Sequence, residues 1–85
     1  MTYVVDASFV VVALASRGPE GSWAEGILTS DEIAAPHFMP AEVANMLRRS
    51  VLQGRLSQDQ ASQAHADLLE LRVTLFAYAN YGARV

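Results

Sequence analysis

The chain has 85 residues, of which 52% are hydrophobic and 18% are charged, and its formal net charge is −3. This composition predicts one small globular domain and excludes a disordered tail. The negative charge argues against nonspecific attraction to nucleic acid over the whole surface. The sequence holds no cysteine, which excludes disulfide bonds and thiolate metal sites and fits a reducing cytosol. So much apolar surface on a short chain predicts burial against further residues, a twin subunit or a partner protein.

The segment Phe9 to Ala15 is apolar but is not expected to enter a membrane. It is shorter than the roughly 20 residues that a transmembrane helix needs. It also lacks the basic residues that precede the apolar part of a signal peptide. We therefore expect a cytoplasmic protein without membrane contact.

The first elements are a strand and a helix. Thr2 to Val5 is short and β-branched with no polar alternation, which predicts a buried strand. Ala7 to Ala15 is too long to continue that strand and predicts a helix, which Asp6 or Ser8 would cap.

A turn and a second strand follow. Residues 16–21 form a turn cluster, and Ser22 to Leu28 predicts a short helix with Trp23 as a core or interface anchor. Ile33 to Ala35 predicts a small strand that ends at Pro36, because the residue before proline favours extended backbone.

Two longer helices occupy the second half. The first runs from about Pro40 to Leu52 and stops at Gly54. The second begins after Ser57, where Gln60 completes a capping box, and continues to about Leu71.

Arg72 to Tyr78 predicts a third strand, and residues 79–85 have helical character. Strands that alternate with helices predict an α/β domain in which helices cover both faces of a parallel sheet.

Two carboxylates follow predicted strands. Asp6 stands at the carboxyl end of the first strand, where ligands of open parallel sheets bind. Glu42 stands in the first turn of the helix after the second strand. Each residue alone is explained by helix capping or by the helix dipole. If both share one concavity, they form half of a divalent-metal site. Ser8 is either a hydroxyl near a metal-bound water or a first-turn residue.

Polar residues continue along the helix that carries Glu42. Glu42, Asn45 and Arg49 lie on one predicted helical face. Asparagine is a poor helix former, which favours a hydrogen-bonding role such as orienting Glu42. Arg48, Arg49 and Arg55 form a basic patch that fits either phosphate contact or compensation of the helix dipole.

Three strings of the sequence together resemble the PIN-domain toxins of the VapC type. They are Val4–Ser8, Ala35–Arg49 and Gly54–Ser57, and the resemblance extends over the whole chain. The Asp–Ala–Ser string is weak alone. Combined with the later Glu–Val–x–Asn–x–Leu string it becomes fairly specific.

The resemblance implies a PIN-like three-layer α/β/α fold and an endoribonuclease that depends on Mg²⁺ or Mn²⁺. Such a protein is the toxin of a toxin–antitoxin pair, is commonly a homodimer or higher assembly, and is held inactive by a cognate antitoxin. In this family, Asp6 and Glu42 correspond to the first two acidic positions of the site. Ser8 corresponds to the accompanying hydroxyl and Asn45 to a supporting position.

The chain departs from the family pattern in its later part. The family requires one or two further aspartates, and no aspartate follows Asp67 here. We therefore expect residues 1–85 to form a single PIN-like domain that lacks its C-terminal strands. Such a domain would have an open apolar sheet edge and little or no nuclease activity alone.

The main alternative is a truncated or degenerate PIN module that acts only in dimer or antitoxin binding. A receiver-like phosphate-binding domain with Asp6 as acceptor is a weaker alternative, because no acidic pair precedes Asp6 and the sequence holds no lysine. A dinucleotide-binding fold is excluded, because no glycine-rich turn follows the first strand.

Overall fold

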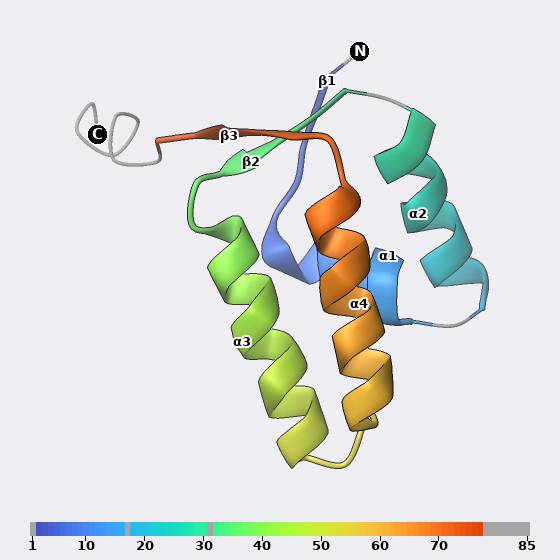
Figure 1. Cartoon of the computed structure of the whole chain (residues 1–85). Coiled ribbons are helices and arrows are strands. Elements are labelled where there is room, and N and C mark those ends of the chain that lie inside the picture. The colour runs from blue at the N-terminus through green and yellow to red at the C-terminus, as the bar shows by residue number, and fades with distance from the viewer. Residues whose placement is uncertain (1, 17, 31, 78–85) are drawn as a thin grey trace.

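The structure is a computed structural model, and it describes residues 2–16, 18–30 and 32–77. Over this part of the chain the elements follow in the order β1, α1, α2, β2, α3, α4, β3 (Figure 1). No helix among these residues has both the length and the apolar character needed to cross a membrane.

The described strands form one parallel sheet in the order β1-β2-β3. Tyr3 is in register with Ile33, and Ala34 with Thr74. Each strand is joined to the next by two helices, so the prediction of a parallel α/β domain with flanking helices is confirmed. The bounds are β1 Thr2–Val4, β2 Glu32–Pro36 and β3 Val73–Phe76.

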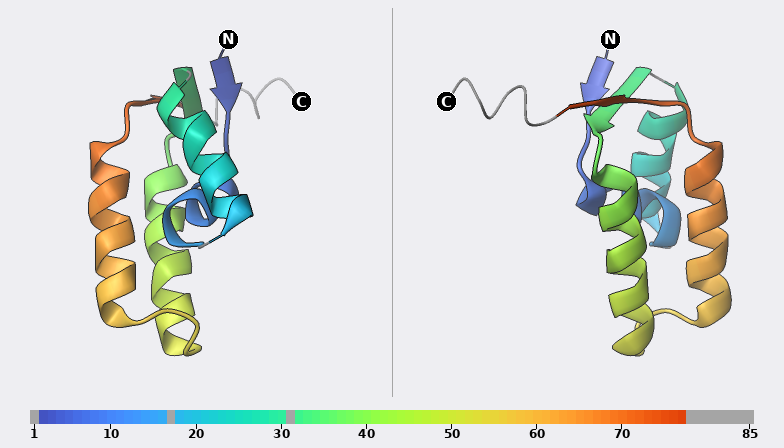
Figure 2. Two further views of the ribbon diagram at one scale, coloured as in Figure 1. Left: turned by 90° about the vertical axis from the view of Figure 1, so that its right-hand side faces the viewer. Right: turned by 60° about the vertical axis from the view of Figure 1, so that its left-hand side comes forward.

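Helix α1 is central among the described helices, because it contacts the three others. Figures 1 and 2 show α2 on one side of α1 and the antiparallel pair α3 and α4 on another. The bounds are α1 Ala7–Ala15, α2 Pro19–Ser30, α3 Met39–Leu52 and α4 Gln58–Glu70.

Local signals position the helix ends as predicted. The Ser57 hydroxyl accepts a hydrogen bond from the Gln60 amide at 3.0 Å, and the Gln60 side chain accepts one from the Ser57 amide at 2.8 Å. This reciprocal pair is the expected capping box. After α3, Gly54 has a φ of 75°, a left-handed conformation that glycine adopts without steric cost.

Helix α2 is longer than predicted. It begins at Pro19 rather than at Ser22, so part of the expected turn cluster is helical. Proline suits the first helical position because its missing N–H would have no intrahelical partner there. Gly21 is buried within this first turn, and a Cβ atom at that position would overlap the Ser16 carbonyl. Its glycine therefore reflects a close backbone approach between α1 and α2.

The hydrophobic core draws on helices from both halves of the chain. Val10 of α1 and Val43 of α3 have no exposed surface. Among the described residues no polar or charged side chain is buried. The remaining core residues are Val5, Ala7, Ala13, Ala24, Leu28, Ile33, Ala35, Met39, Leu47, Ala64 and Leu68.

The prediction that the first strand is buried is wrong for β1. Thr2, Tyr3 and Val4 are all exposed, and 70% of Val4 is accessible, whereas Val5 just beyond the strand is buried. The reason is the position of β1 at an edge of the sheet, where β2 is its only neighbour among the described strands.

Two other expectations need correction or lie beyond the described residues. Trp23 is not a core residue, because 66% of it is exposed, although its ring meets Phe9 edge to face at 5.9 Å. The third strand is shorter than predicted and ends at Phe76. Tyr78 and the tail of residues 79–85 lie outside the described part of the chain.

Candidate functional site

Asp6 lies at the junction of β1 and α1. The Val5 amide donates to the Ala34 carbonyl at 2.9 Å, so the chain still runs beside β2 when it reaches this junction. The Asp6 backbone is extended, and its Oδ1 accepts a hydrogen bond from the Phe9 amide at 2.9 Å. The capping interpretation is therefore confirmed. An exposed carboxylate retains acceptor capacity beyond this one bond, so capping does not exclude a ligand role.

Ser8 lies in the first turn of α1 and is exposed. Of the two predicted capping residues, the structure assigns the cap to Asp6. Ser8 thus presents its hydroxyl at the same helix end as the Asp6 carboxylate, where the positive end of the helix dipole favours negative groups.

Glu42 lies in the first turn of α3 and is also exposed. Its amide donates to the Phe38 carbonyl at 3.1 Å, which places it at the start of the regular helix. Val43 and Leu47 turn into the core, which directs the neighbouring position 42 to the surface. Glu42, Asn45 and Arg49 are all exposed, as expected for the polar face predicted for this helix.

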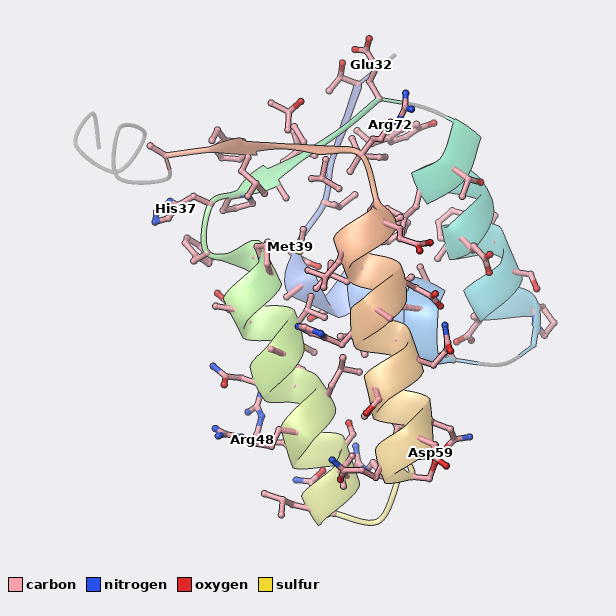
Figure 3. All side chains as sticks on the ribbon, viewed as in Figure 1. Glu32, His37, Met39, Arg48, Asp59 and Arg72 are labelled. Carbon is pink, nitrogen blue, oxygen red and sulfur yellow. The ribbon has the colours of Figure 1, made fainter. Side chains whose placement is uncertain are left out.

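The parallel sheet brings the first turns of α1 and α3 to the same end of the sheet, the carboxyl end where the strands finish. Both helices follow the carboxyl ends of adjacent parallel strands, and Figures 1 and 2 show their first turns side by side. Figure 3 shows His37 and Met39 at this end and Glu32 at the opposite end of β2. Asp6 and Glu42 thus start two helices that open at the same end of the sheet, as their positions after strands predicted.

The polar face of α3 continues with Asn45, Arg48 and Arg49, which are all exposed. Arg48 Nη2 donates a hydrogen bond to Asn45 Oδ1 at 3.5 Å. Because an arginine can only donate, this contact directs the carbonyl oxygen of Asn45 toward Arg48 and leaves its NH₂ group as a donor for another acceptor. The roles predicted for Asn45 toward Glu42, and for Arg48 and Arg49 toward RNA, stay predictions.

The carboxylates of Asp6 and Glu42 are the type of ligand that a hard divalent cation prefers, but these two are too few to complete a site. Mg²⁺ prefers carboxylate oxygen ligands, and Asp6 and Glu42 offer them. Over the described ranges, however, no group of three or more His, Cys, Asp or Glu side chains is arranged to hold a metal ion. The described residues therefore supply at most part of a coordination shell.

The chain is similar to two curated proteins, and no protein-family model matches it. It is 44% identical over 61 residues to Ribonuclease VapC1 of Mycobacterium tuberculosis strain CDC 1551 / Oshkosh. The identity to Ribonuclease VapC1 of M. tuberculosis strain ATCC 25618 / H37Rv is also 44% over 61 residues. Each match covers 72% of this chain and 46% of the relative, so the chain spans about half the length of the curated relatives it matches.

Proposed function

Because this chain is a relative of the VapC-type PIN-domain ribonucleases, we propose that it is part of a metal-dependent endoribonuclease, the toxin of a toxin–antitoxin pair. The observation that carries the proposal is the 44% identity to Ribonuclease VapC1 over 72% of the chain. The arrangement of Asp6 and Glu42 at the carboxyl end of the sheet supports it independently. Residues 1–85 would form a single PIN-like domain that holds the first half of the catalytic site.

In the proposed site, Asp6 and Glu42 would hold Mg²⁺, with Mn²⁺ as an alternative. A bound Mg²⁺ supplies Lewis acidity at a phosphate oxygen and lowers the pKa of an attacking water. Ser8 would hydrogen-bond that water, and the free NH₂ group of Asn45 would orient the Glu42 carboxylate.

The arginines of α3 fit the approach of an RNA backbone. Arg49 is exposed on the face of α3 that also carries Glu42, and Arg48 is exposed on the side that lies toward α4. A guanidinium contacts phosphate through two parallel hydrogen bonds, which positions a strand without reading its sequence. We propose that the protein acts in the cytoplasm as a homodimer or higher assembly and is inhibited by a cognate antitoxin protein.

The test is RNA cleavage by two proteins, the 85-residue chain and a chimera that continues it with the remaining part of M. tuberculosis VapC1. We expect cleavage of total tRNA by the chimera with Mg²⁺ and little or none by the chain alone. Asp6→Asn and Glu42→Gln should each lower cleavage by the chimera more than roughly 100-fold, because loss of an outer-shell partner alone costs 10–100-fold.

Asp59→Asn is the matched control, because Asp59 is an exposed carboxylate in the first turn of α4. It should leave cleavage unchanged. A chimera that cleaves equally well with Asp6→Asn would refute the assignment of the site. Cleavage by the chain alone, above the level of its Asp6→Ala variant, would refute the view that the described site is incomplete.

A second candidate function is binding without catalysis, in which the chain acts only in dimer or antitoxin contacts. The specific observation in its favour is the uncovered β1 edge with Val4 70% exposed. Mn²⁺ titration of the chimera separates the two functions. Binding that is lost with Asp6→Asn and retained with Asp59→Asn favours the nuclease, and no binding favours the binding module.

A further inference from the structure

The segment between β2 and α3 carries two aromatic side chains at the carboxyl end of the sheet. His37 follows β2 directly and is exposed, and Figure 3 shows its ring projecting outward, away from the ribbon. The His37 amide donates to the Phe76 carbonyl at 2.7 Å, which ties this segment to β3 as well. Phe38 is partly buried and forms the N-cap of α3. Neither aromatic residue has a role in the proposed metal site.

The two rings support one another. The ring centroids of His37 and Phe38 are 5.5 Å apart and their planes meet at 78°, which is an edge-to-face contact. Such a contact uses at most one face of the imidazole, and because His37 is exposed, its ring keeps an open face toward solvent. An aromatic ring that is held at a fixed angle and open on one face is a stacking platform for a nucleobase.

This platform lies beside the proposed metal ligand Glu42. The Glu42 amide donates to the Phe38 carbonyl at 3.1 Å, so one turn of backbone joins the two residues. Side chains four residues apart lie on one side of a helix, about 6 Å apart along its axis. Arg49 is exposed on the same side, two turns beyond Glu42. A strand lying along this side of α3 would therefore meet a base contact, the metal site and a phosphate contact in turn.

We propose that His37 stacks on an unpaired nucleobase of the substrate RNA, next to the phosphate at the metal site, while Phe38 holds the imidazole in place. The contact would select a single-stranded segment or a loop, because a base inside a duplex has no open face for stacking. Stacking tolerates every base, so His37 would position the strand without reading its sequence. The inference rests on the proposed function, since it names the form of RNA that the same site accepts.

The experiment is binding of two fluorescein-labelled octamers to the 85-residue chain and to the VapC1 chimera, with Ca²⁺ in place of Mg²⁺ to slow cleavage. One octamer is single-stranded RNA, and the other has the same ribose-phosphate backbone without bases. Low salt is used, because phosphate contacts weaken as the salt concentration rises. We expect tighter binding of the RNA than of the abasic strand by roughly 5- to 150-fold, the equivalent of about 1–3 kcal/mol for one stacked base.

Variants separate stacking from the other contacts that an exposed histidine makes. His37→Ala should weaken RNA binding by roughly 5- to 150-fold and leave binding of the abasic strand unchanged. His37→Phe keeps an aromatic ring and should retain most of the affinity. Phe38→Leu, which keeps apolar bulk without the ring, should give a smaller loss in the same direction. The matched control is His65→Ala, because His65 is an exposed histidine of α4 that lines a hollow beside α3, and it should have no effect.

Three results would overturn the inference. One is equal binding of the two octamers by both proteins, or no binding of either octamer. Another is a His37→Ala variant with unchanged affinity for RNA, which would leave the exposed ring to a protein partner. The third is a His37→Phe variant as weak as His37→Ala, with a salt dependence reduced by about one phosphate, which would make His37 a phosphate contact.

Cleavage of RNA by the chimera is measured separately from binding. Cleavage without base-dependent binding would refute only the stacking role of His37. Base-dependent binding without cleavage would refute only the nuclease proposal. The two failures are therefore distinguishable.

Discussion

The helical core around α1 and the edge strand β1 are both rich in apolar, β-branched residues, but the core residues are buried and those of β1 are exposed. Val43 of α3 is completely buried, whereas Val4 of β1 is 70% exposed. Helix α1 is in contact with three other helices, and β1 pairs with β2 alone among the described strands. The comparison teaches that apolar, β-branched residues predict which element forms, while the number of packed neighbours decides how much that element contributes to stability.

The largest test of this comparison uses two leucines of one helix. Leu47 is 3% exposed and Leu52 is 79% exposed, and both belong to α3. Leu47→Ala should lower the free energy of unfolding by about 2–5 kcal/mol, because it leaves a cavity in the core. Leu52→Ala should change it by less than about 0.5 kcal/mol. Urea denaturation measures both, and equal effects would contradict the described core.

Two glycines of α2 test packing at the backbone level. A Cβ atom at Gly21 would overlap the Ser16 carbonyl, whereas one at Gly26 meets no atom within 4 Å. Gly21→Ala should therefore destabilise the protein by roughly 1–3 kcal/mol through overpacking. Gly26→Ala should stabilise it by roughly 0.5–1 kcal/mol, because alanine has less conformational entropy in the unfolded chain than glycine and so loses less when the helix forms. Thermal unfolding of the pair checks the sign of each change, and a stabilising Gly21→Ala would rule out the close approach of α1 and α2.

Neighbouring valines test the boundary between the open edge and the core. Val5 is 7% exposed and Val4 is 70% exposed. Val5→Thr buries a hydroxyl and should cost roughly 1–2 kcal/mol of unfolding free energy. Val4→Thr places the same hydroxyl in solvent and should change stability by less than about 0.5 kcal/mol. A large cost at Val4, measured by urea denaturation, would indicate that the β1 edge is covered in solution.

Much of the fold could be predicted because its signals are local. The capping box at Ser57, the glycine stop at Gly54 and the cap at Asp6 each depend on residues within one helical turn, and all three are confirmed. The exposure of Val4 and Trp23 could not be predicted in this way, because burial depends on which distant elements pack against a residue.

The same distinction applies to the candidate site. Asp6 and Glu42 could be placed at one end of the sheet because parallel strands direct their carboxyl ends together. A complete ligand set could not be predicted, because the described residues do not contain one. A groove of about 370 Å³ between α3 and α4 was missed, since it is lined by residues of two separate helices, among them Ala44 and Ala61. The pattern of small residues on both helices is the signal that could have indicated it.

Asp6 joins the open strand to the packed helix, and loss of its helix cap is expected to cost less than the core substitution at Leu47. Asp6→Ala removes the acceptor of the Phe9 amide and should cost about 1 kcal/mol of unfolding free energy. Asp6→Asn keeps a capping oxygen and should stay within a few tenths of a kcal/mol of the parent. Chemical denaturation of the two variants, with Ser57→Ala as a capping control on α4, measures the difference. Because asparagine keeps the cap and removes the charge, a stable Asp6→Asn variant that no longer binds Mn²⁺ would show that this carboxylate serves both the helix and the metal. Equal destabilisation by Asn and Ala would instead mean that the negative charge itself, at the positive end of α1, provides the stability.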